Sequence, residues 1–178
     1  MSSKEVLRAE GIKKMKNQSL EEKRERDRFL TESFLSHPLY KEAETVASFL
    51  SMDLEFDTRL LIDRALADGK KVYLPKTLPG RQMTFLPYHP DKLKQSPFGV
   101  WEPFESGPAI SKDQLDLIQV PGVVWDERGY RIGFGGGYYD RYLADYPGAT
   151  LSLAYGFQKA SFKEESFDIS VGEVIWSD

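Results

Sequence analysis

The chain has 178 residues, enough for one domain that buries most of its surface, and its 24 basic and 28 acidic residues leave a net charge of −4. It contains no cysteine, which excludes disulfides, thiolate metal sites and cysteine nucleophiles. No apolar run has the length of a membrane span and no signal-like segment follows the first residues, so we expect a cytoplasmic protein. The negative charge disfavours nucleic-acid binding, and we expect no nucleic acid, membrane or obligate protein partner.

The first half of the chain predicts a helix and then a β-α-β unit. Ser19 and Glu22 have the spacing of a capping box, which begins a helix that extends to Leu35. Residues 45–50 are apolar and β-branched and predict a buried strand. A helix capped by Asp57 or Thr58 and ended by Gly69 follows, and residues 71–74 predict the next strand.

Four more strands are predicted at residues 83–86, 115–120, 151–155 and 174–176. Residues 76–113 are rich in proline and are predicted to form a long irregular excursion. Strands separated by helices indicate an α/β fold: a single layered domain over residues 1–178 with a central, largely parallel (mixed) β-sheet flanked by helices.

The most informative segment is RIGFGGGYYDR at residues 131–141, in which four glycines precede a predicted helix beginning at Tyr138. Glycine allows a close approach of the backbone to a ligand, and free N–H groups at a helix start favour a phosphate. Tyr138 and Tyr139 stand where a Walker loop needs Lys and Ser or Thr, and the G-x-G-x-x-G pattern is also absent. A glycine turn that only lets a strand and a helix pack closely is the alternative.

Positive charge is concentrated at the start of the chain. Residues 1–16 carry five basic and two acidic side chains. Lys4 and Arg8 are four residues apart, so on a helix they share one face and could bind one polyanion. The alternative is a solvated helix face.

Two loops should meet at the carboxyl ends of the parallel strands, where open α/β sheets bind ligands. These are residues 50–55 and 121–137. Asp57 is explained by helix capping, whereas Glu55 has no comparable structural role.

His37 and His89 each precede a proline and lie near no candidate nucleophile. An enzyme of this composition would take its reactivity from a phosphorylated cosubstrate.

The region from 120 to 143 carries a recognisable combination: VPGV at 120–123, Asp126, and GYRIGFGGGYYDRYL at 129–143. It resembles the signature of the 5-formyltetrahydrofolate cyclo-ligase family, and the resemblance covers nearly the whole chain. Lys4 with Arg8, FLSM at 49–52 followed by Glu55 and Thr58, and FGVWEP at 98–103 fall in the expected order.

The resemblance implies the ATP-dependent cyclisation of 5-formyltetrahydrofolate to 5,10-methenyltetrahydrofolate, with release of ADP and phosphate. In such a reaction ATP phosphorylates the formyl oxygen, a folate nitrogen attacks the activated carbon, and phosphate leaves. No protein nucleophile is needed, which agrees with the absence of cysteine. Magnesium is implied as cofactor and ATP as cosubstrate.

The resemblance also implies site residues. Nucleotide contacts fall on Lys4, Arg8, Arg131, Ile132, Gly133, Phe134, Gly135, Gly136, Gly137, Tyr138 and Tyr139, of which Arg131 and Tyr139 are the catalytic candidates. Folate contacts fall on Leu50, Glu55, Phe134, Gly135, Gly136, Gly137 and Tyr138, with Phe98 and Trp101 as further packing candidates. Asp140 and Asp168 are the magnesium candidates; their alternatives are a helix-terminus charge and an ordinary surface residue.

Phe134 departs from the family pattern, because many members have a basic residue there. A charge-assisted hydrogen bond is worth about 1.5–3 kcal/mol, so its loss could cost roughly tenfold or more in nucleotide affinity or rate. Two other functions stay open: an ATP-dependent ligase or kinase of another small substrate, and a non-catalytic folate-binding module.

Overall fold

A six-stranded sheet forms the centre of the protein, for which a computed structural model describes residues 3–97 and 99–178. The strand order is β10-β9-β6-β1-β2-β3, and all neighbours are parallel except the antiparallel pair β2 and β3. The α/β class and the largely parallel, mixed sheet predicted from the sequence are therefore confirmed. The helices are α1 Lys4–Asn17, α2 Leu20–Leu35, α3 Pro38–Glu42, α4 Thr58–Ala67 and α5 Tyr138–Leu143, with 3-10 turns η1 Pro79–Arg81 and η2 Gly156–Gln158. The strands are β1 Thr45–Ala47, β2 Lys71–Leu78, β3 Gln82–Pro87, β4 Leu93–Gln95, β5 Trp101–Pro103, β6 Leu117–Gln119, β7 Val124–Trp125, β8 Arg131–Ile132, β9 Ala149–Ala154 and β10 Glu173–Trp176.

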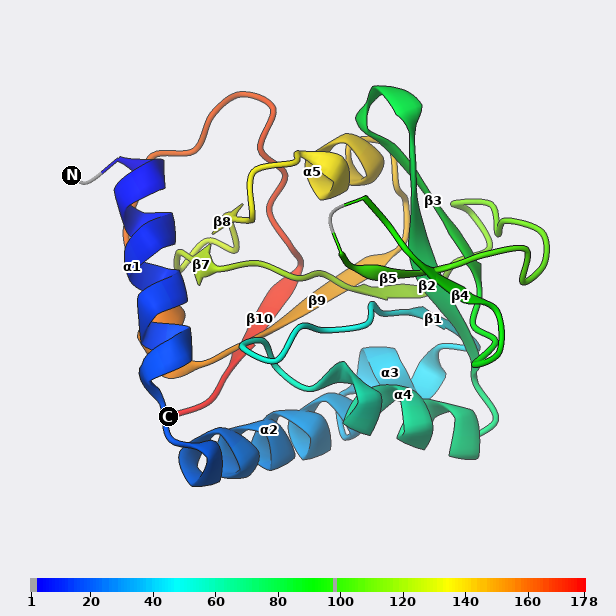
Figure 1. The fold of residues 1–178 in the computed structure, drawn as a ribbon, viewed down its shortest axis with the longest axis horizontal. Helices are drawn as coiled ribbons and strands as arrows, with labels where there is room; N and C mark the ends of the chain where they lie inside the picture. The colour runs from blue at the N-terminus through cyan, green and yellow to red at the C-terminus, as the bar shows by residue number, and fades with distance from the viewer. Residues whose placement is uncertain (1–2, 98) are drawn as a thin grey trace.

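Helices cover both faces of the sheet: α2, α3 and α4 lie on one side and α5 on the other (Figure 1). Successive side chains of a strand point to opposite faces of the sheet, so each strand contributes to a hydrophobic core on either face. Val46 and Leu117 pack among the leucines and phenylalanines of α2 and α4, whereas their neighbours Ala47 and Ile118 pack with Tyr142 of α5. The sheet is buried on both faces, as parallel sheets require.

Helix α1 stands beside the β7–β8 hairpin (Figure 1). Gly11 allows this close approach, since a Cβ there would lie 2.8 Å from a methyl of Val123 and 3.0 Å from one of Val124. Met15 is buried in the same contact with Ile132 of β8. This packing fixes the start of α1 above the glycine-rich segment. None of the helices in the described ranges has the length and apolar character needed to cross a membrane.

Local predictions for the first half hold in the helices, whereas the strand predicted at 45–50 is shorter, because β1 ends at Ala47. The side chain of Ser19 accepts the Glu22 N–H and that of Glu22 accepts the Ser19 N–H, so the predicted capping box is present at the start of α2. Asp57 caps α4, and Gly69 after it has φ +80°, the left-handed conformation common after a helix end. The predicted β-α-β unit is β1–α4–β2.

The prediction of an irregular excursion at 76–113 is wrong in part. Strand β2 continues to Leu78, turns through η1 and returns as β3, and β4 and β5 form a separate antiparallel pair. Pro87 and Pro103 each end their strand, and Pro75 lies in β2 beyond Tyr73, the last residue of β2 that pairs with β1.

Candidate functional site

A cavity of about 630 Å³ opens where the chain leaves the carboxyl ends of β1 and β6. Its walls come from segments far apart in the sequence: the start of α1, the loop after β1, the β2–β3 hairpin, β5, the glycine-rich segment and residues 165–168. The residues predicted as catalytic, nucleotide, folate or magnesium contacts all line this cavity: Lys4, Arg8, Leu50, Glu55, Arg131, Ile132, Gly133, Phe134, Gly135, Gly136, Gly137, Tyr138, Tyr139, Asp140 and Asp168.

The glycine-rich segment connects β8 to α5 along one wall of the cavity. Gly135 and Gly137 have φ of +107° and +73°, conformations that favour glycine. A Cβ on Gly136 would lie 2.7 Å from the ring of Tyr138. Within the described part of the chain, the backbone N–H groups of these three glycines have no hydrogen-bond acceptor. They are therefore available to an anion in the cavity.

Helix α5 has only six residues, so its dipole adds little. The positive charge comes instead from side chains. Lys4 and Arg8, on one face of α1 as predicted, both reach the cavity. Arg8 donates from Nε to the carbonyl oxygen of Gly133 at 2.7 Å, which ties α1 to the glycine-rich segment.

Arg131 lies on the cavity floor, 7% exposed, with its guanidinium 5.5 Å from the ring centre of Tyr139. Burial lowers the pKa of Arg131, while the charge of Asp140 opposes this effect. Burial raises the pKa of Tyr139, while Arg131 opposes it. The Nε of Arg131 and the hydroxyl of Tyr139 are buried without a partner among the described residues. Two unsatisfied polar groups lining one cavity are costly unless a ligand engages them.

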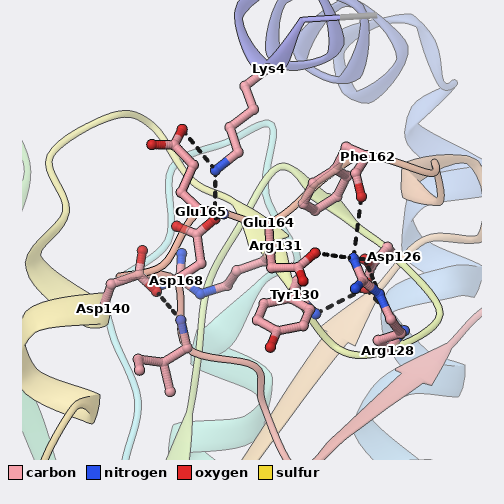
Figure 2. A network of polar contacts seen from close by, with 11 residues as sticks. Lys4, Asp126, Arg128, Tyr130, Arg131, Asp140, Phe162, Glu164, Glu165 and Asp168 are labelled. Atoms are coloured by element: carbon pink, nitrogen blue, oxygen red, sulfur yellow. Dashed lines mark hydrogen bonds and ion pairs between the residues drawn. The ribbon is translucent and has the colours of Figure 1, made fainter. Parts of the chain in front are cut away.

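Acidic side chains lie beside Lys4 and Arg131 and neutralise their charge (Figure 2). Lys4 Nζ lies 2.5 Å from Asp168 Oδ2 and 3.4 Å from Glu165 Oε1. Arg131 lies 3.8 Å from Asp140 Oδ1, which also accepts the N–H of Ile169, the neighbour of Asp168. Asp168 is 9% exposed, so the alternative of an ordinary surface residue is wrong.

Asp140 and Asp168 suit a magnesium ion that arrives with phosphates. Magnesium takes one or two carboxylates from a protein and its other ligands from water and phosphate oxygens. Among residues 3–97 and 99–178, no three His, Asp or Glu side chains come together as a metal cluster. The donor set therefore fits an ion shared with a ligand rather than one held by the protein alone.

Glu55 lies on another wall, in the loop between β1 and α4. It is 8% exposed, and its Oε1 accepts the backbone N–H of Met52 at 2.9 Å. Burial raises the pKa of Glu55 to about 7, and the Met52 hydrogen bond and the charge of Lys23 limit the rise. The loop is fixed by Thr58, whose backbone N–H donates to the Ser51 hydroxyl and whose own hydroxyl accepts the Ser51 N–H. A buried carboxyl group that faces a cavity, and whose pKa is raised to near neutral pH, is typical of a binding site.

Several cavity residues were not predicted from the sequence. Met83 lies in β3, which is the strand predicted at residues 83–86, and Phe167, 62% exposed, comes from the segment after η2. No local pattern identifies either. Trp101, a predicted packing candidate, lines the cavity and is 47% exposed. Phe98, the other candidate, lies outside the described residues.

Asp126, part of the recognised signature, acts on the backbone beneath the site. Its Oδ1 accepts the N–H groups of Arg128 and Tyr130, and its Oδ2 pairs with the Arg128 guanidinium at 2.7 Å. Figure 2 shows this cluster beside Arg131. Asp126 therefore shapes the turn that leads into β8.

A cavity with a cationic glycine-rich wall and a buried carboxyl group, at the carboxyl edge of an α/β sheet, is typical of an enzyme that binds an anionic small molecule. The family model of the 5-formyltetrahydrofolate cyclo-ligase family matches residues 1–174. The 5-formyltetrahydrofolate cyclo-ligase of Haemophilus influenzae is 33% identical over 143 residues, 76% of either chain. That of Mus musculus is 29% identical over 198 aligned positions, covering 99% of this chain and 95% of the mouse protein.

The solution structure of Aquifex aeolicus 5,10-methenyltetrahydrofolate synthetase superposes with a TM-score of 0.85 at 33% identity, covering 97% of this chain and 89% of that one. The chain belongs to the 5-formyltetrahydrofolate cyclo-ligase family. It is an enzyme with 5-formyltetrahydrofolate cyclo-ligase activity, also called methenyltetrahydrofolate synthetase activity, in one-carbon metabolism. The family is ATP-dependent, and its substrates are 5-formyltetrahydrofolate and ATP.

Proposed function

We propose that residues 1–178 act as one α/β domain in the cytoplasm, binding both substrates in the single cavity described above. Its volume of about 630 Å³ lies in the usual range for small-molecule sites. The assignment rests on one observation: the positively charged groups and the buried carboxyl group lie on different walls of the cavity. Lys4, Arg8, Arg131 and free glycine N–H groups provide one wall, and Glu55 provides another.

The cationic wall is proposed to bind the ATP phosphates. Gly135, Gly136 and Gly137 offer N–H donors to phosphate oxygens, and Lys4 and Arg8 neutralise their charge. Lys4 must leave Asp168 to reach a phosphate, which exposes the carboxylate at the same moment. Nucleotide binding and metal binding are thereby coupled through one ion pair.

A magnesium ion held by Asp140 and Asp168 would neutralise charge on the phosphate oxygens. Asp168 is oriented for this role by the backbone N–H of Glu165, which donates to Oδ2 at 2.9 Å. Asp140 is oriented by the N–H of Ile169 at 3.1 Å.

Glu55 is proposed to bind the pterin of the folate. An ionised carboxylate accepts hydrogen bonds from the pterin amine and ring N–H groups. Leu50, 8% exposed, and the half-exposed Phe134 and Trp101 supply apolar contacts for the rings. Tyr138 and the glycines stand between the two substrates, so the formyl group can face the γ-phosphate.

In the first step, the formyl oxygen attacks the γ-phosphorus, and the bond to the ADP oxygen breaks. Arg131 would stabilise the phosphoryl oxygens, since its Nε is buried without a partner. The hydroxyl of Tyr139, kept protonated by burial, would donate a hydrogen bond to an oxygen of the transferring phosphoryl group. In the second step, the folate N10 attacks the formyl carbon, loses its proton, and phosphate leaves with the former formyl oxygen.

Oxygen labelling tests this sequence of steps. With 18O in the formyl group of 5-formyltetrahydrofolate and unlabelled water, mass spectrometry of the released phosphate should find one 18O per phosphate. Label released into water instead, with unlabelled phosphate, would contradict phosphorylation of the formyl oxygen.

A further inference from the structure

A second, much smaller cavity lies behind Glu55. Its volume is about 20 Å³, enough for one water molecule. Phe49, Glu55, Pro121 and Gly122 line both this inner cavity and the substrate cavity. Glu55 therefore borders both cavities.

Trp125 contributes an unused hydrogen-bond donor to the inner cavity. Its side chain is 2% exposed, and its Nε1–H has no acceptor among the described residues. The benzene edge of the indole approaches Gly122: a Cβ on Gly122 would lie 2.9 Å from Cζ2 and 3.2 Å from Cε2, the carbon that is bonded to Nε1. Both residues line the inner cavity. A buried N–H without a partner is costly, and in native proteins an ordered water commonly satisfies it.

Of the other polar groups around the inner cavity, Gln119 keeps a free Nε2 donor and Glu55 keeps a free acceptor among the described residues. Gln158 uses both ends of its amide, accepting from Tyr155 N–H at 2.8 Å and donating to the Val123 carbonyl at 3.1 Å. Gln119 accepts from the Ser48 hydroxyl. Glu55 accepts only the Met52 N–H, through Oε1, from the described residues. A donor and a free acceptor thus border a space of the size of one water.

We propose that one buried water occupies this inner cavity, accepting a hydrogen bond from Trp125 Nε1 and donating one to the Glu55 carboxylate. Trp125 is then a positioning residue: it never touches substrate but orients Glu55 toward the substrate cavity. The expected effect of Trp125 on folate binding rests on the proposed role of Glu55, whereas the presence of the water does not depend on that role.

Trp125→Phe removes the donor, but it also replaces the buried indole with a smaller phenyl ring, so a shift in pH dependence rather than a loss of affinity alone reports the water. The other groups whose charge or hydroxyl acts on Glu55 stay in place: Lys23 on α2, Tyr139 on α5 and Tyr155 after β9. A changed pH dependence in this variant would then report the lost hydrogen bond.

The water is tested directly in the wild-type protein by NMR. The Nε1–H of Trp125, assigned by its disappearance in Trp125→Phe, should show a cross-relaxation signal to a long-lived water. The partly exposed Trp101 and Trp176 supply reference signals in the same spectrum. The absence of a long-lived water at Trp125 would overturn the proposal without any variant having to fold.

The positioning role is tested by titrating 5-formyltetrahydrofolate into each protein across pH 6–9, with a non-hydrolysable ATP analogue present. Trp125→Phe should bind the folate about three- to tenfold more weakly at pH 7.5, the expected effect of one hydrogen bond. The midpoint at which affinity falls on acidification should move to higher pH, and affinity for the ATP analogue should not change. Trp176→Phe is the matched control, since Trp176 lines neither cavity.

The outcomes separate the two ideas. A long-lived water together with unchanged folate affinity in Trp125→Phe would overturn the positioning role. If Glu55→Gln also left folate affinity unchanged, the proposed folate contact of Glu55 would fail, while the NMR signal would still establish the water.

Discussion

Glu55→Gln should make the enzyme more stable at alkaline pH while weakening its binding of folate. Burial raises the pKa of Glu55 from 4.5 to about 7. Between these two values the folded protein holds a proton that the unfolded chain releases. The stability that this group contributes is therefore full below about pH 4.5 and is lost as pH rises through about 7.

The magnitude follows from the shift. A change of about 2.5 pKa units corresponds to about 3 kcal/mol at pH 8.5, where Glu55 is ionised in both states. A glutamine has no charge to desolvate, and its amide oxygen can still accept the Met52 N–H. The variant should thus exceed the wild type by about 3 kcal/mol at pH 8.5 and by less than about 1 kcal/mol at pH 5.

Urea unfolding followed by tryptophan fluorescence at the two pH values measures this difference. Glu10→Gln, a change at an exposed carboxylate of α1, is the control and should stay within about 0.5 kcal/mol of wild type at both. A stabilisation of equal size at pH 5 and pH 8.5, or a loss at pH 8.5, would refute the reasoning that burial raises the pKa of Glu55.

The same variant should lose folate affinity by about tenfold at pH 8.5, the difference between a charge-assisted and a neutral hydrogen bond, with ATP affinity retained. The loss should shrink on acidification, because wild-type Glu55 then becomes neutral as well. Calorimetric titration of each ligand measures both effects. Equal weakening of folate and ATP in a folded protein would contradict a folate-specific role for Glu55.

Three further variants test the nucleotide wall by steady-state kinetics. Lys4→Ala should raise KM for ATP about tenfold, because one charge-assisted contact is lost. Lys13→Ala, a change at an exposed residue of the same helix, should leave KM for ATP unchanged. Equal effects of the two changes would argue against a phosphate contact of Lys4. Gly136→Ala should lower kcat/KM about tenfold, because its Cβ would lie 2.7 Å from the Tyr138 ring. Gly69→Ala is the control: the new Cβ would lie in open space, so the variant should keep its activity and lose about 1 kcal/mol of stability through backbone strain. Phe134→Arg should lower KM for ATP about tenfold by restoring a basic residue, and an unchanged KM would show that the existing cations suffice.

Local features of the fold could be predicted because their causes are local. The capping box at Ser19 and the helix after the last glycine depend on residues within a few positions, and both lie where the sequence places them. Strands β4 and β5 could not be predicted in this way. Each has only three residues, with no apolar alternation, and the two strands exist because they pair with each other.

The same distinction applies to the candidate site: some of its features are local in the sequence, and others arise from the packing of distant segments. The glycine-rich segment and the Lys4–Arg8 spacing are visible in the sequence, and the family resemblance links them to a reaction. The burial of Glu55 and the ion pair between Lys4 and Asp168, which lie 164 residues apart, arise only when distant segments pack together. The inner cavity behind Glu55 is likewise a product of packing, around Trp125 and Gly122.

The most direct test of the whole account is a near-ultraviolet absorbance assay with 5-formyltetrahydrofolate, magnesium and ATP, run on the wild type and Arg131→Ala. The account predicts a rise in absorbance from the methenyl product that requires ATP and is nearly abolished in the folded variant, because Arg131 stabilises the transferring phosphoryl group. Product formation without ATP, or at the wild-type rate in Arg131→Ala, would contradict it.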